Sequence, residues 1–496
     1  MEDSDGMPQE RRQNQYTGKK TGGAGSRSGQ IRSVRQLALE AMTAVMDNGE
    51  YCDKVLHRIL EQQTGLDRRD RAFLMRLVEG TIERCVEIDY VIDRYSKLPV
   101  AKQKPMVRQI LRLAVYQIMY MDQVPDSAAC NEAVRLACTN HLIPLKGFVN
   151  GVLRNVVRFH EDTPYPKAKE NLVRHLSVWY SMPEWIVTRF MEQYGPQQTE
   201  AILRSFLDEE RGISLRCNLS RASKEDIVAS LRKQGVTVEE GRLFPNALRI
   251  RDYGRLNELE AFEKGWVQVQ DESSLIVGEA APVNEDSVVI DVCAAPGGKS
   301  IHIADKMHGE GLIRACDLTK EKVTLIRQNL IRTGFHNVKL KKHDAMEFIP
   351  EWEETADVVV ADLPCSGLGV IGHKADIKYK TKPEDIRALA VQQRKILKNV
   401  YRYLKPGGTL LYSTCTIAPE ENEEQAAWIA EKLPLEPVML KTLLPESVLG
   451  ECAEKGYLQV LPDLAGGKSP LRPWILGGFG SVIAANICLL LFFYFL

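Results

Sequence analysis

Apolar side chains recur at intervals of three and four residues through the first part of the chain, from about residue 34 to residue 159. The clearest stretch contains Ile110, Leu111, Leu113, Ala114, Ile118 and Met119. This spacing places them on one face of a helix, and it predicts an all-helical domain over residues 35–160. Two prolines within residues 162–166 then interrupt the pattern, which indicates a linker.

The pattern is mixed between residues 167 and 285. The stretch 224–235 has helical spacing, whereas 214–219 and 247–250 are short runs typical of strands. We therefore expect a small α+β middle domain in this part of the chain.

Short apolar runs alternate with helical stretches beyond residue 285. Strands are expected at 287–292, 311–316, 338–342, 356–361 and 409–413, with one helix starting near 299 and another at 320–334. Strands that alternate with helices form parallel βαβ units and a doubly wound sheet, whose ligands bind at the carboxyl ends of the strands. We predict a Rossmann-like α/β domain over residues 286–460.

The chain has 496 residues, 44% of them hydrophobic and 26% charged, and a net charge of -1. This composition is typical of a soluble globular protein of about three domains, and it argues against a uniformly basic nucleic-acid coat. Eleven cysteines occur without a CxxC pair, and no secretory signal precedes them. We therefore expect neither a disulfide framework nor a metal site, and a reducing, cytoplasmic environment.

Both ends depart from this composition. Residues 11–35 contain seven arginines and lysines and no acid, so residues 1–34 are predicted to form a disordered basic arm, either in contact with phosphates or simply solvated. The tail at 461–496 is atypically apolar. Its last part, 474–496, has no charged residue and is long enough to span a bilayer, although its glycines and Asn486 weaken that interpretation.

The first expected strand of the α/β domain runs into a loop of small residues. The loop consists of Cys293, Ala294, Ala295, Pro296, Gly297, Gly298 and Lys299. Such residues let the backbone turn sharply and approach a ligand at the start of the next helix. A Walker A loop would need glycine at position 293, and the dinucleotide fingerprint GxGxxG is absent. An ordinary tight turn remains an alternative.

Acidic residues end the next two strands. Asp317 closes the second strand, and Asp344 follows the third. An acid at the first position can bind ribose hydroxyls and one farther on can bind the adenine edge, although aspartate also commonly caps helices. Together with the loop, the two acids predict a nucleoside-binding crevice.

Two cysteines follow neighbouring strands of the expected sheet. Asp362 ends the fourth strand shortly before Cys365, and Cys415 follows the fifth. A single cysteine is usually a small buried hydrophobe, but two thiols beside an acid suit methylation at carbon 5 of cytosine. One thiolate adds to carbon 6 while Asp362 acts at N3, and the second thiol assists release of the product.

These motifs resemble those of the RNA cytosine-5 methyltransferases, and specifically of the RsmB family, also called Sun or Fmu, which acts on 16S ribosomal RNA. The resemblance extends from about residue 35 to about residue 460. It implies that the loop CAAPGGK at 293–299 binds S-adenosylmethionine, with Asp317, Asp344 and Asp362 completing the site. It also implies that Cys415 of the TCT motif is the nucleophile and that Cys365 of the PCSG motif helps to release the product.

The helical region resembles a NusB-type RNA-binding module at 70–73, 77–80 and 148–154. This module distinguishes the RsmB family from other RNA cytosine-5 methyltransferases, so 16S ribosomal RNA is the expected partner. Three alternatives stay open: methylation of transfer RNA or another ribosomal RNA, a noncatalytic RNA-binding assembly factor, and a P-loop ATPase. The intact pair of cysteines disfavours the assembly factor, and Cys293 disfavours the ATPase.

The chain departs from the family pattern at two places. Residues 372–379 replace a segment of the form RKPDIKW, and Lys374, Asp376 and Lys378 remain available there for contacts with RNA. The end of the chain lacks the family's usual last strand, of the form GTDGFFIA. The apolar tail is then a membrane anchor, a divergent last strand or the product of a shifted reading frame. We favour the shifted frame, because ribosomal RNA gives no reason for membrane anchoring.

Overall fold

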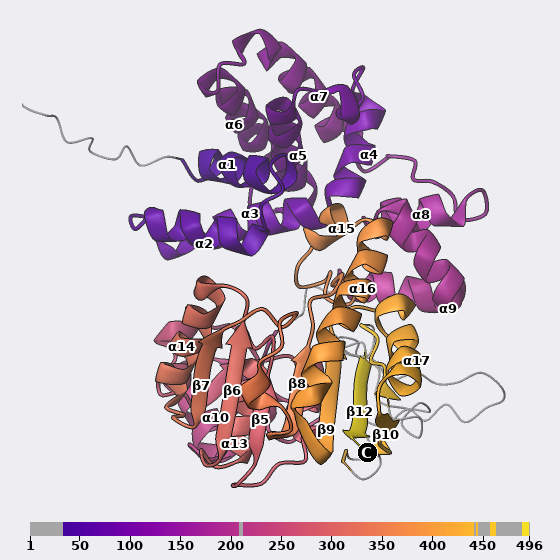
Figure 1. Ribbon diagram of the computed structural model, residues 1–496. Helices are drawn as coiled ribbons and strands as arrows, with labels where there is room; N and C mark the ends of the chain where they lie inside the picture. Colours follow the sequence, from indigo (N-terminus) through magenta and orange to yellow (C-terminus); the bar gives the residue numbers. More distant parts are fainter. Residues whose placement is uncertain (1–32, 208–211, 441–442, 445–456, 463–488, 496) are drawn as a thin grey trace, which may run out of the picture.

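The structure is a computed structural model that describes residues 33–207, 212–440, 443–444, 457–462 and 489–495. A helical domain lies at one end of the molecule, and a parallel sheet flanked by helices lies at the other (Figure 1). A second, smaller sheet packs against the parallel one. The predicted basic arm falls outside the described residues, apart from its last two positions.

The predicted all-helical domain is confirmed. Its helices are α1 (Val34–Met46), α2 (Cys52–Gln62), α3 (Arg68–Glu83), α4 (Cys85–Tyr95), α5 (Pro105–Tyr120), α6 (Asp126–Thr139) and α7 (Lys146–Phe159). The chain enters α1 and α3 through Ser33 and Asp67, whose side chains accept hydrogen bonds from the first turn. α5 is the central helix, since every residue from 109 to 117 is buried. Gly80 lets Tyr116 pack directly against α3, because a Cβ there would lie 2.0 Å from the tyrosine oxygen.

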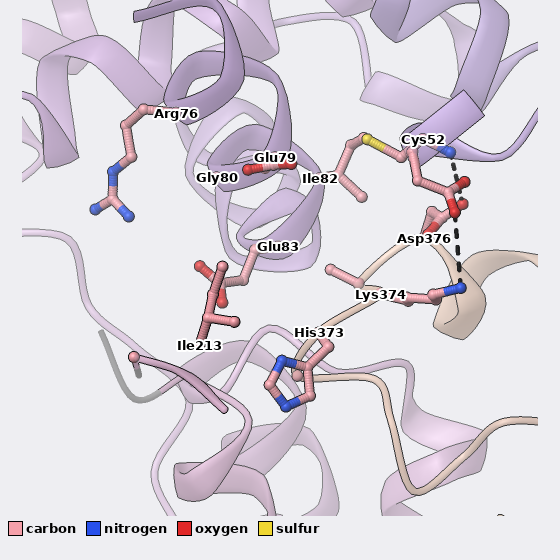
Figure 2. Close-up of a pocket in the computed structure, with 14 residues that line it drawn as sticks. Cys52, Arg76, Glu79, Gly80, Ile82, Glu83, Ile213, His373, Lys374 and Asp376 are labelled. Carbon is pink, nitrogen blue, oxygen red and sulfur yellow. Dashed lines mark hydrogen bonds and ion pairs between the residues drawn. The ribbon is translucent and has the colours of Figure 1, made fainter. Parts of the chain in front are cut away.

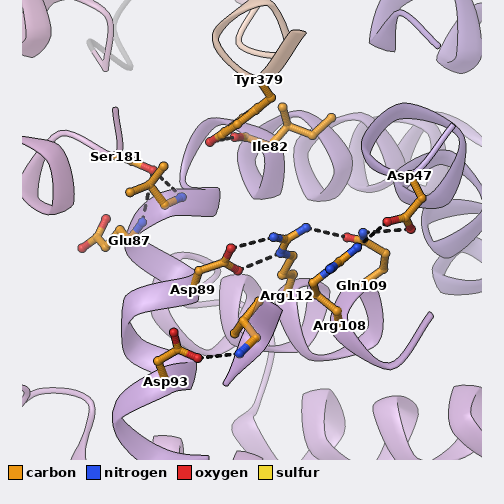
Figure 3. Close-up of polar contacts among 12 residues, drawn as sticks. Asp47, Ile82, Glu87, Asp89, Asp93, Arg108, Gln109, Arg112, Ser181 and Tyr379 are labelled. Atoms are coloured by element: carbon orange, nitrogen blue, oxygen red, sulfur yellow. Dashed lines mark hydrogen bonds and ion pairs between the residues drawn. The ribbon is translucent and has the colours of Figure 1, made fainter. Parts of the chain in front are cut away.

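Charged side chains inside the helical domain are paired (Figure 3). Arg112, which is 7% exposed, donates to both carboxylate oxygens of Asp89, at 2.7 and 2.6 Å, and to Gln109 at 3.2 Å. Asp47 accepts hydrogen bonds from Arg108 and Gln109. A bidentate arginine–carboxylate pair fixes geometry as well as charge, so this network sets the positions of α4 and α5 and of the end of α1.

The middle part of the chain has the predicted α+β character. It contains α8 (Leu172–Trp179), α9 (Glu184–Ser205), β1 (Ile213–Cys217), α10 (Lys224–Lys233), β2 (Thr237–Glu240), β3 (Ala247–Arg251), α11 (Glu260–Glu263) and β4 (Val267–Val269). The strands form an antiparallel sheet in the order β2-β3-β1-β4. Arg216 of β1 is fully buried where this sheet meets the next domain, and it donates to Asp305 at 3.3 Å and to Gln270 at 3.0 Å.

The predicted doubly wound sheet is also confirmed. Its elements are β5 (Val288–Asp291), α13 (Gly298–Lys306), β6 (Leu312–Asp317), α14 (Lys320–Thr333), β7 (Val338–Lys342), β8 (Ala356–Asp362), α16 (Pro383–Val400), β9 (Leu404–Thr414), α17 (Glu423–Lys432), β10 (Leu435–Pro437), β11 (Tyr457–Leu458) and β12 (Leu489–Phe495). β7, β6, β5, β8 and β9 are parallel in that order. α12 (Glu272–Ala280) precedes β5, yet its Leu275 and Val277 belong to the core of this sheet. The domain boundaries expected from the sequence stay predictions, because α12 lies before the expected boundary at residue 286 but packs in the core of the large sheet.

The last described residues extend the sheet. β12 pairs antiparallel with β9, with Leu489 opposite Thr414 and Tyr494 opposite Thr409. This pairing agrees with a divergent last strand, one of the three interpretations of the apolar tail, whereas residues 463–488 lie outside the described part. No helix in the described ranges is long and apolar enough to cross a membrane. The shifted reading frame that we favour is not tested by the pairing and stays a prediction.

A short helix joins the helical domain to the parallel sheet. α15 (Ile377–Lys380) lies against α3, and the Lys378 ammonium donates to the carbonyl oxygens of Glu83 at 2.6 Å and Ser181 at 2.7 Å. Asp376 accepts a hydrogen bond from the backbone of Cys52 at 3.0 Å. Both Lys378 and Asp376 are buried. The expectation that they remain available to RNA is therefore wrong, because interdomain backbone groups already hold them; Lys374 alone of the three is exposed.

We predict that Lys378→Ala lowers the free energy of the first unfolding transition in urea by about 1–3 kcal/mol, because two buried carbonyl groups lose their donor. Lys374→Ala is the matched control. Lys374 is exposed and lies 3.6 Å from Asp53, and an exposed ion pair contributes about 0–1 kcal/mol. Equal effects of the two substitutions would show that α15 does not hold the domains together.

Candidate active site

The carboxyl ends of four parallel strands meet at one edge of the large sheet. β5 pairs with both β6 and β8, and β8 pairs with β9. Asp291, Asp317 and Asp362 are the last residues of β5, β6 and β8, and Cys415 directly follows β9. The strand order therefore brings together the loop 293–299, two of the three predicted acids and both predicted cysteines.

The loop 293–299 has a backbone that larger residues would not allow. Gly297 has a φ of 103°, in the left-handed region, and a Cβ there would lie 3.1 Å from Ile326 Cγ2. The Ala294 N–H donates to the carbonyl of Cys316 at 2.8 Å, and the Ala295–Pro296 peptide is cis. Burial raises the pKa of the Cys293 thiol, which keeps it protonated at neutral pH. The loop thus lies tightly between the ends of β5 and β6.

The two other predicted acids of the crevice differ in their surroundings. Asp317 is buried, and its carboxylate accepts hydrogen bonds from the N–H groups of Ala295 at 3.0 Å and Leu318 at 2.7 Å and lies 2.8 Å from the Lys322 ammonium. Asp344 follows β7 and accepts a hydrogen bond from the Met346 N–H at 2.9 Å. Asp317 thus fixes the loop directly, whereas Asp344 caps a turn.

Asp362 is held by two side chains from neighbouring elements. The Lys299 ammonium of α13 lies 2.6 Å from one carboxylate oxygen, and the Ser413 hydroxyl of β9 donates to the other at 2.7 Å. Burial disfavours the charged form of Lys299, but the carboxylates of Asp362 and Asp291 outweigh this effect and raise its pKa. Lys299 is therefore an ammonium, and it orients Asp362 at the edge of the sheet.

The sequence analysis missed one acid of the site. Asp291 ends β5 and is 1% exposed, and Ser300 at the start of α13 donates to it at 2.6 Å. Burial raises its pKa to about 7. The signal that singled out Asp317, an acid at the end of a buried strand, was also present at Asp291.

The two predicted cysteines lie side by side. Their Sγ atoms are 3.1 Å apart, and the Cys415 N–H donates to the Cys365 sulfur at 3.2 Å. The hydrogen bond with Cys415, burial and the nearby Glu421 carboxylate raise the pKa of Cys365 well above its usual value. Cys365 is therefore a neutral thiol at neutral pH, and its S–H can donate to the sulfur of Cys415.

A cleft of about 360 Å³ lies between α3, the start of β1 and the loop that leads into α15 (Figure 2). Its walls include Arg76, Glu79, Glu83, His373, Lys374 and Asp376. Charges of both signs line the cleft, so its surroundings differ from those of a purely cationic phosphate site. Lys374 and Asp376, which the sequence offered for contacts with RNA, line the cleft. The loop 293–299, the predicted acids and the two cysteines do not line it, so the cleft is separate from the strand-end site.

Comparison with protein families gives matches to three consecutive parts of the chain. Residues 32–158 match the NusB family, and residues 182–256 match the ferredoxin-like domain of RsmF/B-like methyltransferases. Residues 279–467 match the family described as 16S rRNA methyltransferase RsmB/F. The three matches follow the helical domain, the small sheet and the large sheet in turn.

Similar proteins cover most of the chain. "Probable ribosomal RNA small subunit methyltransferase B" of Bacillus subtilis (strain 168) is 38% identical over 88% of this chain and 96% of that protein. Ribosomal RNA small subunit methyltransferase B of Proteus mirabilis is 32% identical over 84% of this chain and 96% of that protein. The crystal structure of PH0851 has a TM-score of 0.74 and 24% identity, covers 94% of this chain and 99% of its own, and supports the fold. On the strength of these relatives, the chain belongs to the RsmB family of ribosomal RNA small subunit methyltransferases.

Proposed function

We propose that this protein transfers a methyl group from S-adenosylmethionine to carbon 5 of a cytosine in 16S ribosomal RNA, with Cys415 as the covalent nucleophile, in the cytoplasm. The observation that carries the proposal is the pair of sulfurs 3.1 Å apart at adjacent strand ends, beside an oriented Asp362. The family supplies the substrate class, because its relatives are named as ribosomal RNA small subunit methyltransferases.

The residues of the loop 293–299 fit the cofactor. A left-handed Gly297 and the adjoining Gly298 leave the backbone free of side chains at the start of α13, where helix N–H groups favour anionic or polar ligand atoms. In this proposal Asp317 binds the ribose and Asp344 the adenine end. When bound there, S-adenosylmethionine would supply a methyl group on a sulfonium, with a neutral thioether as the leaving group. The protein's part is to hold the loop, which Asp317 does through the Ala295 N–H.

Cys415 activates the base. Carbon 5 of cytosine is a poor nucleophile. The Cys415 thiol therefore gives its proton to solvent, the thiolate forms a bond to carbon 6, and the ring electrons move toward N3, which takes up a proton from solvent. Asp362, held by Lys299 and Ser413, stabilises the proton on N3. Carbon 5 thereby becomes an enamine carbon that accepts the methyl group.

Cys365 acts when the product leaves. Water accepts the proton from carbon 5, the electrons of that C–H bond restore the double bond between carbons 5 and 6, and the Cys415 sulfur departs with the electrons of its bond to carbon 6. N3 then returns its proton to solvent. The neutral Cys365 thiol lies 3.1 Å from that sulfur and stabilises the departing thiolate with a hydrogen bond. Two adjacent thiols thus divide attack and release between them.

The helical domain supports RNA as the substrate. Its match to the NusB family covers residues 32–158, and α15 fixes it relative to the thiol site. A cytosine in a duplex must leave its stack to reach a thiol at a sheet edge, so the target is an unpaired or loop cytosine. Methylation of transfer RNA or another ribosomal RNA would use the same chemistry, and the names of the relatives favour 16S ribosomal RNA.

Asp317→Ala should weaken binding of S-adenosylmethionine by about tenfold or more, because the loop loses a charged hydrogen-bond acceptor. Isothermal titration of the purified protein measures this affinity. Asp286→Ala is the control, since Asp286 is exposed before β5, at the opposite edge of the sheet. If both variants bind the cofactor as the unmodified protein does, Asp317 is not part of the cofactor site.

Cys415→Ala should bind S-adenosylmethionine normally and lose methyl transfer to 16S ribosomal RNA by on the order of 10³-fold or more, because the activating addition to carbon 6 is lost. Transfer of a radiolabelled methyl group measures the rate. Cys316→Ala, a substitution of a buried cysteine of β6, controls for the general effect of removing a thiol. Appreciable methylation by Cys415→Ala would contradict the proposed mechanism.

In the Cys365→Ala variant, Cys415 should still attack the base, but the product should not be released. A covalent protein–RNA adduct should therefore accumulate. The adduct appears as a denaturant-resistant band that nuclease treatment collapses. The double variant Cys365→Ala/Cys415→Ala should not form it. If Cys415→Ala traps RNA and Cys365→Ala does not, the two thiols have exchanged roles. If neither traps RNA and both remain active, both thiols are packing residues.

A further inference from the structure

A buried polar cluster lies directly behind the two cysteine loops. Its members are Ser366, Gln393, Tyr412, Thr416, Glu421 and Asn422. All six side chains are buried, and Glu421 and Asn422 are both 0% exposed. Ser366 and Thr416 belong to the PCSG and TCT motifs, but neither they nor the other four were given a role from the sequence, and the proposed reaction does not use them.

Glu421 binds the loop that carries Cys365. It is the last residue of a short 3-10 turn, η6 (Pro419–Glu421). Its carboxylate accepts hydrogen bonds from the Ser366 N–H at 3.0 Å, from the Ser366 hydroxyl at 2.5 Å and from the Gln393 amide at 3.0 Å. The same Gln393 amide donates to the Pro364 carbonyl at 2.9 Å. The residues on both sides of Cys365 are therefore fixed to Glu421, directly or through one side chain.

Asn422 binds the loop that carries Cys415. Its carbonyl oxygen accepts a hydrogen bond from the Thr414 hydroxyl at 2.7 Å, and its amide donates to the Thr416 carbonyl at 2.9 Å. The Ser366 and Thr416 hydroxyls lie 2.6 Å apart and join the two loops. Two consecutive residues thus hold the neighbours of both sulfurs.

The number of hydrogen bonds accepted at position 421 suits a carboxylate better than an amide. Burial raises the pKa of Glu421, while the hydrogen bonds from Ser366 and Gln393 oppose the shift. Among the described residues it forms no ion pair, so its charge is compensated by neutral donors alone. A carboxylate accepts from all three donors, whereas a glutamine has one acceptor oxygen and would turn its own N–H groups toward a donor. Glutamine would fill the same space as Glu421, but only a carboxylate can accept hydrogen bonds from all three donors.

We propose that Glu421 is a positioning residue that sets the distance between the Cys365 and Cys415 sulfurs by holding Ser366 and, through Gln393, Pro364. The effect on methyl transfer rests on the proposed function, whereas the effect on the sulfur–sulfur distance does not. Glu421 touches neither base nor cofactor in this role. It acts by keeping the two thiols within reach of one another.

The test compares Glu421→Gln with Glu424→Gln, a matched control at an exposed position on α17. We expect Glu421→Gln to lower kcat for methylation at least tenfold while KM for S-adenosylmethionine stays within twofold. In the Cys365→Ala background it should slow formation of the covalent RNA adduct by a similar factor. An adduct in Cys365→Ala with Glu421 intact is the positive control, because its absence would count against the proposed function rather than against the role of Glu421.

A second readout follows the sulfurs without RNA or cofactor. Treatment with diamide oxidises two nearby thiols to a disulfide while the diazene is reduced to a hydrazine, and peptide mass spectrometry measures the Cys365–Cys415 cross-link. The cross-link should form at least tenfold more slowly in Glu421→Gln than in Glu424→Gln. If Glu421→Gln does not fold, Ser366→Ala removes one of the three donors and should slow both the cross-link and kcat by a smaller factor. Unchanged cross-linking in the variant that folds overturns the proposal, even if kcat falls.

Discussion

β8 and β9 pair in parallel, with Asp362 opposite Ser413. This register decides where the segments after β8 and after β9 leave the sheet. The pairing continues past the strands, because the Leu363 N–H donates to the Ser413 carbonyl and the Gly369 N–H donates to the Cys415 carbonyl, both at 3.1 Å. Two cysteines far apart in the sequence are thereby brought within 3.1 Å of one another. The adjacency of the thiols is a consequence of parallel strand pairing, in which loops at the carboxyl ends of neighbouring strands share one edge of the sheet.

The same segment that carries Cys365 also connects the domains. After the cysteine the chain continues through α15, where Lys378 binds two carbonyl groups of other domains. It then returns to the thiol loop, since the Thr381 hydroxyl donates to the Ser366 carbonyl at 3.2 Å. The orientation of the helical domain and the position of Cys365 therefore depend on one stretch of chain. In the proposed function, in which the helical domain contacts RNA and Cys415 attacks a base, this connection fixes the RNA-contacting domain relative to the thiols.

Much of this arrangement could be predicted from the sequence, because it follows from local pattern. Apolar runs indicated the strands, and the residues that end them, such as Asp317 and Asp362, necessarily lie at the edge of a parallel sheet where the carboxyl ends of its strands meet. Contacts between distant residues carry no such local signal. Lys378 sits in a polar stretch typical of a surface, and only the carbonyls of Glu83 and Ser181 make its burial tolerable. Glu421 likewise lies among acids that suggest a solvated turn, although the fold buries it behind both cysteines.

We propose that this protein methylates carbon 5 of a cytosine in 16S ribosomal RNA through Cys415. Bisulfite sequencing of that RNA tests it most directly, because 5-methylcytosine resists the conversion that unmodified cytosine undergoes. The RNA is taken from cells that lack the gene and from the same cells carrying either the unmodified gene or Cys415→Ala. We expect one resistant cytosine, whose resistance is lost with the gene, restored by the unmodified gene and not restored by Cys415→Ala. A pattern of conversion that is the same in all three strains, or restoration by Cys415→Ala, would contradict it.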